Sequence, residues 1–309
     1  MNAIELSRNL FETYGLPMLK RDFPAELSQI ACGIAGRGSD SFGFDDEVSR
    51  DHDFEAGFSL WLTDEMEERA GFRLNRAYRK LAENFPQIKS EKSLYGVSEK
   101  GVVRISDFLR RHIGIPRVPE SWQEWLYIPD YAFAEVVNGE IFYDESKIFS
   151  SIREKIINGM PEDVRYKKLA AAAVLMAQSG QYNYSRCLAH GEKAAAILAL
   201  ADFSRYTVSM YFLLNHSFAP YWKWSLRALR SLPCGGKTAA DDLETLLCGN
   251  LPAKDNQLLI EKICAATAEI LRKNNLTGSS DAYLESHAVE ITGRIRSGEI
   301  RELHLMEGI

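Results

Sequence analysis

Helical patterns run almost without interruption through the second half of this 309-residue chain, whereas strand patterns occur only before Asp144. The helices expected there cover residues 147–158, 163–179, 182–201, 203–215, 222–232, 239–247, 256–273 and 280–297. Because no strand pattern returns, the sequence predicts an all-helical bundle over residues 151–309. Residues 1–150 mix strand and helix patterns, which predicts an α+β domain with a mixed sheet and flanking helices. Domains of roughly 150 residues are common, so two domains agree with the length.

Two strands of the first domain are predicted around a glycine-rich turn. An apolar run over residues 29–35 ends in Gly36-Arg37-Gly38-Ser39, where two glycines allow the backbone to turn sharply and approach a ligand closely. Residues 51–62 alternate between polar and apolar side chains. As a strand, this segment places Asp51, Asp53 and Glu55 on one face and an apolar row on the other. The apolar row can then enter a core, while the acidic row faces a cleft.

A hairpin is predicted further along the chain, because Asn138-Gly139 separates the short apolar runs 131–137 and 140–143 and suits a type I′ turn. The aromatic segment 122–128 is also expected to be extended. Residues 84–121 contain several prolines and glycines around one expected helix, 105–112, and are interpreted as an insertion near the active face.

Composition limits the classes of function. Hydrophobic residues make up 46% and charged residues 26%, as in globular proteins, and the net charge of -6 argues against a general polyanion binder such as a nucleic-acid-binding protein. The five cysteines are odd in number and include no Cys-x-x-Cys pair, which favours reduced thiols. Glu5 and Arg8 interrupt the apolar core that a secretory signal would need. A cytoplasmic protein without a membrane association is therefore expected.

The densest group of chemically useful side chains is Gly38-Ser39 followed, after eleven residues, by Asp51-His52-Asp53. Backbone amides of a small-residue turn can hold a triphosphate. Two carboxylates two residues apart on a strand can hold Mg²⁺ against those phosphates. By strand alternation His52 points away from the metal face, and a hydrogen-bonded core histidine is the favoured interpretation over a metal ligand.

This arrangement resembles the nucleotidyltransferase signature of the DNA polymerase β superfamily. More closely, GRGSDSFGFDDEVSRDHDF resembles the DUF4037 branch of that superfamily, and so do the later segments NGEIFYD, PEDVRYKKLA and APYWKWSLRALRSLP. The resemblance extends over much of residues 30–235. It implies a polymerase β-like catalytic domain followed by a helical domain that closes the cleft. It also implies a Mg²⁺-dependent enzyme that moves NMP, most readily AMP from ATP, to a hydroxyl of a small-molecule acceptor and releases pyrophosphate.

The resemblance implies that Asp51 and Asp53 bind the metal and that Gly38 and Ser39 bind the phosphates. A third carboxylate from a neighbouring strand would act as the base or complete the metal shell, and Glu135 is the candidate. A glutamate on an edge strand in solvent is the alternative interpretation of Glu135. Arg37 and Arg50 could steer phosphate. The alternative interpretation, that each is an ordinary surface arginine, describes the commoner case.

Further candidates come from the helical half. Tyr221 and Lys223 follow a proline at a helix start, where an aromatic ring could stack on a base and a lysine could reach a phosphate. A second group follows a helical spacing and could close the cleft over nucleotide or acceptor, with a solvated helix face as the alternative: Asn183, Arg186 and His190. Glu192 is a possible base on the acceptor side, by analogy with helical-domain glutamates of the enzymes that adenylylate aminoglycosides, which the family resembles.

Two other functions stay open at this stage. The chain could be a nucleotide-binding regulatory protein with little turnover, or it could nucleotidylate a protein. Whether the acceptor is a small molecule or a protein, the residues that select it are expected in the 84–121 insertion and in the helical half.

Overall fold

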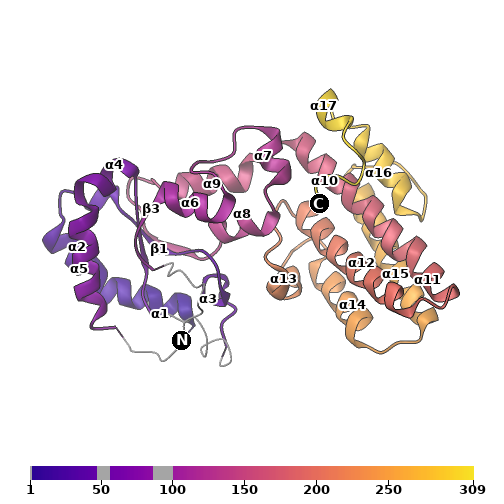
Figure 1. Ribbon diagram of the computed structural model, residues 1–309, viewed down its shortest axis with the longest axis horizontal. Coiled ribbons are helices and arrows are strands. Elements are labelled where there is room, and N and C mark those ends of the chain that lie inside the picture. The colour runs from indigo at the N-terminus through magenta and orange to yellow at the C-terminus, as the bar shows by residue number, and fades with distance from the viewer. Residues whose placement is uncertain (1, 47–55, 86–99) are drawn as a thin grey trace. The chain divides into compact units, whose positions relative to one another are not determined.

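The computed structural model describes residues 2–46, 56–85 and 100–309 (Figure 1). The backbone divides into two compact units, Met1–Pro119 with Ala132–Gly159, and Glu120–Tyr131 with Met160–Ile309. We call them the sheet unit and the helical unit. The sequence predicted one boundary near residue 150. The observed division instead lies after Gly159, and it also assigns twelve residues before that point, Glu120–Tyr131, to the helical unit.

The sheet unit is built on a four-stranded mixed sheet with the order β3-β2-β1-β4. The strands are β1 (Ala31–Ile34), β2 (Ser59–Leu62), β3 (Gly101–Arg104) and β4 (Glu140–Tyr143). β1 pairs antiparallel with both β2 and β4, and β2 pairs parallel with β3. The predicted fold class, a mixed sheet with flanking helices followed by an all-helical part, is confirmed.

Helices cover this sheet. Before β3 they are α1 (Ala3–Leu10), α2 (Leu16–Asp22), α3 (Ser39–Phe42), α4 (Asp64–Met66) and α5 (Phe72–Ala82), with π-helical turns at Phe11–Gly15 and Glu67–Gly71 and a 3-10 turn at Leu27–Gln29. After β3 come α6 (Ile105–Ile113), α8 (Asp130–Val137) and α9 (Ser150–Gly159). α8 begins two residues before the sheet unit resumes at Ala132.

Both faces of the central strands are buried, which explains why β1 is apolar throughout and why β2 is apolar after the buried Ser59. On one face Cys32, Leu60 and Leu62 pack in a core with Phe58 and Leu74. Trp61 projects from the opposite face of β2, by strand alternation. Its ring stacks on that of Phe149 at 4.4 Å between centroids and meets the ring of Phe108 edge-on at 5.8 Å.

The predicted strand 51–62 is shorter in the described part of the chain, because only Ser59–Leu62 are in β2. Residues 51–55 lie outside the described residues. Gly57 has a φ of 149°, and the Tyr78 hydroxyl both donates to the Phe58 carbonyl at 2.8 Å and accepts from the Phe58 amide at 3.2 Å. The Tyr78 hydroxyl thus occupies the Phe58 amide, whereas the Phe58 carbonyl also accepts from the Gly101 amide of β3 at 2.9 Å, and β2 begins at Ser59.

The predicted hairpin over residues 131–143 is wrong, since its first arm is helix α8 and β4 pairs with β1 instead. The residues from Ala132 to Val136 are all buried, so this run shows no alternation that could distinguish a strand from a buried helix. Gly139, with a φ of 65°, follows the end of the helix in the left-handed conformation. Asn138-Gly139 therefore terminates a helix.

The aromatic segment 122–128 is helical rather than extended. α7 (Trp122–Tyr127) begins with a capping box, in which the Ser121 hydroxyl accepts from the Glu124 amide and the Glu124 carboxylate accepts from the Ser121 amide. The prediction for the 84–121 insertion is confirmed for its helix, α6, but it missed β3. A four-residue strand is too short to give a recognisable period.

The helical unit is all-helical, as predicted, since every residue from 160 to 309 is described and none is in a strand. After α7 its helices are α10 (Glu162–Met176), α11 (Ser185–Ala189), α12 (Lys193–Leu214), α13 (Trp222–Leu229), α14 (Gly236–Cys248), α15 (Ala253–Lys273), α16 (Leu284–Thr292) and α17 (Gly298–Arg301), with a π-helical turn at Ala177–Tyr184.

Two of the helix boundaries predicted for this unit are wrong. The chain breaks at Gly191, which has a φ of 77°, whereas helices were predicted over 182–201 and 203–215. Left-handed glycine commonly ends a helix. By length and composition α12 could span a bilayer, but 56% of its apolar window is buried inside the protein, as in a core helix.

Candidate functional site

The Gly36–Ser39 turn leaves the carboxyl end of β1 and leads into α3 (Figure 1). Gly36 and Gly38 have φ values of 123° and 96°, which L side chains rarely adopt. Gly36 is buried, whereas Gly38 is exposed and caps the start of α3. A β-carbon on Gly38 would lie 2.7 Å from Asp40 Oδ1. The turn thus presents backbone next to a central strand with no side chain at Gly38, and such a turn can bind an anion through its amides.

Asn138 holds this turn from 102 residues away in the sequence. Its Oδ1 accepts from the Gly36 amide at 3.0 Å, and its Nδ2 donates to the Gly36 carbonyl at 2.7 Å. Both backbone groups of a buried glycine are satisfied by one side chain. Asn138 is therefore a positioning residue for the turn, a role that has no local signal in the sequence.

Arg153, on α9, supports the end of α8. Its Nη2 donates to the carbonyls of Val137 at 2.5 Å and Asn138 at 2.6 Å. A cation at a helix carboxyl end also interacts favourably with the helix dipole. Burial lowers the pKa of Arg153 to about 10, because desolvation disfavours its charged form. Arg153 remains a cation at neutral pH and fixes the segment that carries Asn138.

The hydrogen bonds of Asn138 give the first prediction. Asn138→Ala leaves the Gly36 amide and carbonyl without this partner, and each buried unsatisfied group costs about 1–3 kcal/mol. We expect urea denaturation to show a loss of unfolding free energy of about 2–4 kcal/mol. Asn138→Asp, which keeps the shape but sets an oxygen against the Gly36 carbonyl, should also destabilise. Unchanged stability in both variants would show that the turn does not depend on Asn138.

Glu135 lies on α8 and not on a strand, but the structure brings it to the turn. It is 8% exposed, so the alternative of a solvent-exposed edge-strand glutamate is wrong. Its Oε2 contacts His112 Nδ1 at 2.8 Å and accepts from Arg37 Nε at 3.4 Å. Arg37 itself is exposed, and its Nη2 donates to the Arg111 carbonyl at 3.2 Å. A buried carboxylate is thereby linked to the second residue of the turn.

A second, partly buried ion pair lies beside α3. Lys100 Nζ donates to Asp40 Oδ2 at 3.0 Å, and Asp40 Oδ1 accepts from the Ser41 amide at 2.9 Å. Asp45, in the loop after α3, accepts through its Oδ2 from the Ala3 amide at the start of α1 at 3.0 Å. Lys100 and His112 were not recognised from the sequence, because both lie within the 84–121 stretch interpreted as an insertion.

The predicted metal ligands Asp51 and Asp53 lie outside the described residues, as do Arg50 and His52. Their metal-binding and phosphate-binding roles stay predictions. Residues 2–46, 56–85 and 100–309 on their own contain no group of three or more histidine, cysteine, aspartate or glutamate side chains that could hold a metal ion.

In the helical unit, the predicted polar row is not continuous. Asn183 lies in a π-helical turn and Arg186 in α11, whereas His190 follows the end of that helix. Arg186 packs over the Tyr182 ring at 5.1 Å. Arg186, His190 and Glu192 are exposed.

Tyr221 and Lys223 have different surroundings. Tyr221 precedes α13 and lines a cavity of the helical unit. Lys223 Nζ lies 4.9 Å from the centroid of the Trp224 ring, which is a cation–π contact. It is not among the residues that line the cavity. The nucleotide-binding roles of both residues stay predictions.

Comparison with solved structures gives a distant likeness. The chain is similar to a nucleotidyltransferase-like protein from Exiguobacterium sibiricum, with 13% identity, 91% of this chain and 89% of the other covered, and a TM-score of 0.35. A likeness at this level supports no argument about mechanism. No curated protein matches the chain.

The sequence model of one family, described as a domain of unknown function, DUF4037, matches residues 125–225. This segment runs from α7 into α13 and includes Glu135, Asn138 and Tyr221, but not the Gly36–Ser39 turn. The resemblance expected from the sequence is thus confirmed for this part of the chain. Residues 125–225 form a DUF4037 domain.

Proposed function

We propose that this protein is a Mg²⁺-dependent nucleotidyltransferase that moves NMP, most readily AMP, from an NTP to a hydroxyl of a small-molecule acceptor. The observation that carries the proposal is the Gly36–Ser39 turn, fixed by Asn138 at the end of a central strand and followed in the sequence by Asp51 and Asp53. The glycine conformations and the exposed position of Gly38 suit close approach of a phosphate chain.

In the proposed reaction, the acceptor oxygen attacks the α-phosphorus, the bond to the bridging oxygen breaks, and pyrophosphate leaves. Asp51 and Asp53 would hold the metal, whose charge stabilises the phosphate oxygens during displacement. Backbone amides at Gly38 and Ser39 would bind the phosphates, and Arg37 would add a charge-assisted contact. Glu135, buried beside Arg37, is the proposed acceptor of the hydroxyl proton. Most of the rate gain would come from positioning.

Asp53→Asn tests the metal assignment. We expect affinity for a nonhydrolysable ATP analogue in Mg²⁺ to fall, and pyrophosphate release to fall about a thousandfold, because several kcal/mol of charge stabilisation are lost. Calorimetry and a pyrophosphate assay with a panel of hydroxyl acceptors measure the two effects. Asp22→Asn, at an exposed ion pair with Arg21, is the matched control and should leave both unchanged.

If Asp53→Asn binds and transfers as the wild type does, the metal assignment fails. If the wild type binds ATP but releases no pyrophosphate with any small acceptor, the regulatory role or a protein acceptor is favoured instead.

A further inference from the structure

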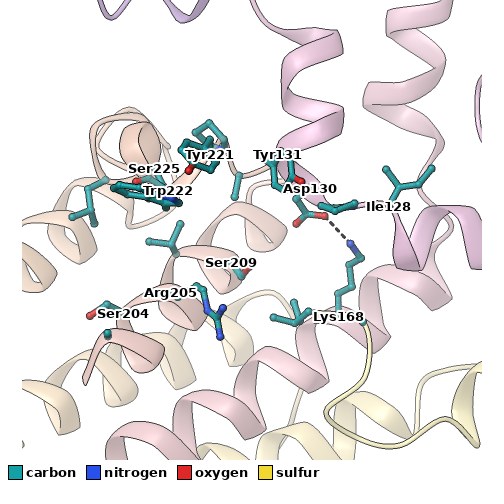
Figure 2. A pocket seen from close by; sticks show the side chains of 18 of the residues that line it. Ile128, Asp130, Tyr131, Lys168, Ser204, Arg205, Ser209, Tyr221, Trp222 and Ser225 are labelled. Atoms are coloured by element: carbon teal, nitrogen blue, oxygen red, sulfur yellow. Dashed lines mark hydrogen bonds and ion pairs between the residues drawn. The ribbon is translucent and has the colours of Figure 1, made fainter. Parts of the chain in front are cut away.

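The helical unit contains a cavity of about 850 Å³ that the proposed nucleotidyl transfer does not use. Its walls come from residues 126–131, Lys168 of α10, α12, the residues around the start of α13, Leu247 of α14, and Gly308 with Ile309 (Figure 2). All lining residues belong to this one unit. Ligand pockets for small molecules commonly have volumes of about 300–1,000 Å³, so the size suits a small organic compound.

A buried ion pair lies in one wall. Lys168 Nζ donates to Asp130 Oδ1 at 2.6 Å, and the two side chains are only 3% and 11% exposed (Figure 2). Among the described residues, no second acceptor is found for the ammonium and no donor for Asp130 Oδ2. Two N–H groups of Lys168 and one carboxylate oxygen are therefore available next to each other. Buried polar groups normally have partners, so this wall is suited to a ligand edge with both an acceptor and a donor.

Aromatic rings form another part of the wall. Tyr131 and Tyr221 meet edge to face at 6.2 Å between centroids, and Trp222 lies 5.2 Å from Tyr221. All three are exposed, Trp222 by 73%. Figure 2 shows Tyr131 and Asp130 next to each other, with Tyr221 and Trp222 along the same wall. Rings that are not packed into a core offer their faces for stacking on a flat ligand.

The remaining charged side chain in the wall, Arg205, is already paired. Arg205 donates to Asp202 Oδ1 and to the Tyr206 hydroxyl, each at 3.0 Å. A charged ligand at the Asp130–Lys168 pair would face repulsion from one member of that pair, and unbalanced buried charge is costly. An uncharged ligand can accept from Lys168 and donate to Asp130 without this penalty.

We propose that this cavity binds an uncharged planar heteroaromatic compound whose edge carries a hydrogen-bond acceptor next to a donor, as in a lactam or an amino-substituted heterocycle. The ring stacks on the tyrosines, the acceptor binds Lys168 Nζ, and the donor binds Asp130 Oδ2. The inference depends only on the helical unit and stands whether or not the protein transfers nucleotides.

Three probes of similar size test the edge chemistry on the full chain by calorimetry or ligand-observed NMR. 2-Quinolinone offers the donor and acceptor, 1-methyl-2-quinolinone offers only the acceptor, and 2-naphthoate is an anion. We expect 2-quinolinone to bind about tenfold more tightly than either, since a hydrogen bond to a charged group is worth about 1.5 kcal/mol. The proposal would be overturned if 2-quinolinone did not bind, if the three probes bound with equal affinity, or if the anion bound most tightly.

A double variant, Asp130→Leu with Lys168→Met, removes both charges together and so avoids leaving one of them buried alone. It should abolish the preference for 2-quinolinone. The matched control makes the same two changes at an ion pair that does not line the cavity, Asp242→Leu with Lys262→Met, and should keep it. If the cavity variant does not fold, the relative affinities of the three probes for the wild-type protein still test the proposal. An unchanged preference in a folded cavity variant would contradict the assignment of Asp130 and Lys168.

Discussion

Gly139→Ala is expected to lower the free energy of unfolding by about 3 kcal/mol or more. Gly139 has a φ of 65°, and a β-carbon there would lie 2.8 Å from the Ile34 carbonyl carbon and closer still to its oxygen. These atoms are backbone of central strand β1, so neither a rotamer change nor a small local shift removes the clash. Urea denaturation followed by circular dichroism measures the loss.

Gly114→Ala is the matched control within the sheet unit. Gly114 also has a positive φ, 78°, but a β-carbon there would have no neighbour within 4 Å. The Gly114→Ala variant should therefore lose only about 1–2 kcal/mol of unfolding free energy, which is the cost of placing an L residue in the left-handed conformation. Equal losses in the two variants would mean that the contact with β1 adds nothing and that the close approach of Gly139 to Ile34 is not important for stability.

Glu135→Gln is expected to reduce nucleotidyl transfer by about 10²–10⁴-fold, the range typical for removal of a general base, if the proposed function holds. The amide keeps the shape of the side chain and can still accept from Arg37, so the fold should persist. The measurement is kcat for pyrophosphate release at saturating ATP, with thermal unfolding as the check on folding. Glu154→Gln, an exposed position on α9, should retain full activity.

The contact between Glu135 and Arg37 allows a second interpretation, in which Glu135 only positions the arginine. Arg37→Met alone and combined with Glu135→Gln separates the two roles. If Glu135 acts only through Arg37, the double variant will be no slower than the slower single variant. Additive losses support an independent role as base, and full activity in Glu135→Gln contradicts both interpretations.

The sequence predicted the fold class because it depends on features that extend over many residues. Long helical patterns after residue 150 and short apolar runs before Asp144 distinguish the two parts of the chain. Predictions failed where a segment was buried on every side. The run from Ala132 to Val136 packs all of its residues, so no period separated strand from helix, and Asn138-Gly139 then suggested the wrong connection.

The candidate site was predictable only in its local part. Gly36 and Gly38 are close in sequence, and their residue type reports the backbone conformation directly. The side chains that fix this turn come from distant parts of the chain, Asn138 from α8's end and His112 through Glu135 from α6. Pairing of this kind is decided by how the elements pack. A single sequence contains no signal for it.

The two hydrogen bonds from the Asn138 side chain to Gly36 also affect how readily this residue deamidates. In an Asn-Gly sequence the glycine nitrogen can attack the side-chain carbonyl, so deamidation converts the amide to aspartate or isoaspartate. Here both amide atoms are bound to Gly36, which restricts the rotation that this attack requires. Once deamidated, the side chain could no longer donate to the Gly36 carbonyl. The chain has a second Asn-Gly pair, Asn158-Gly159, whose exposed asparagine donates only its Nδ2 to the Glu154 carbonyl at 3.1 Å, so ageing of the purified protein is expected to deamidate Asn158 before the turn proposed to bind phosphate is affected.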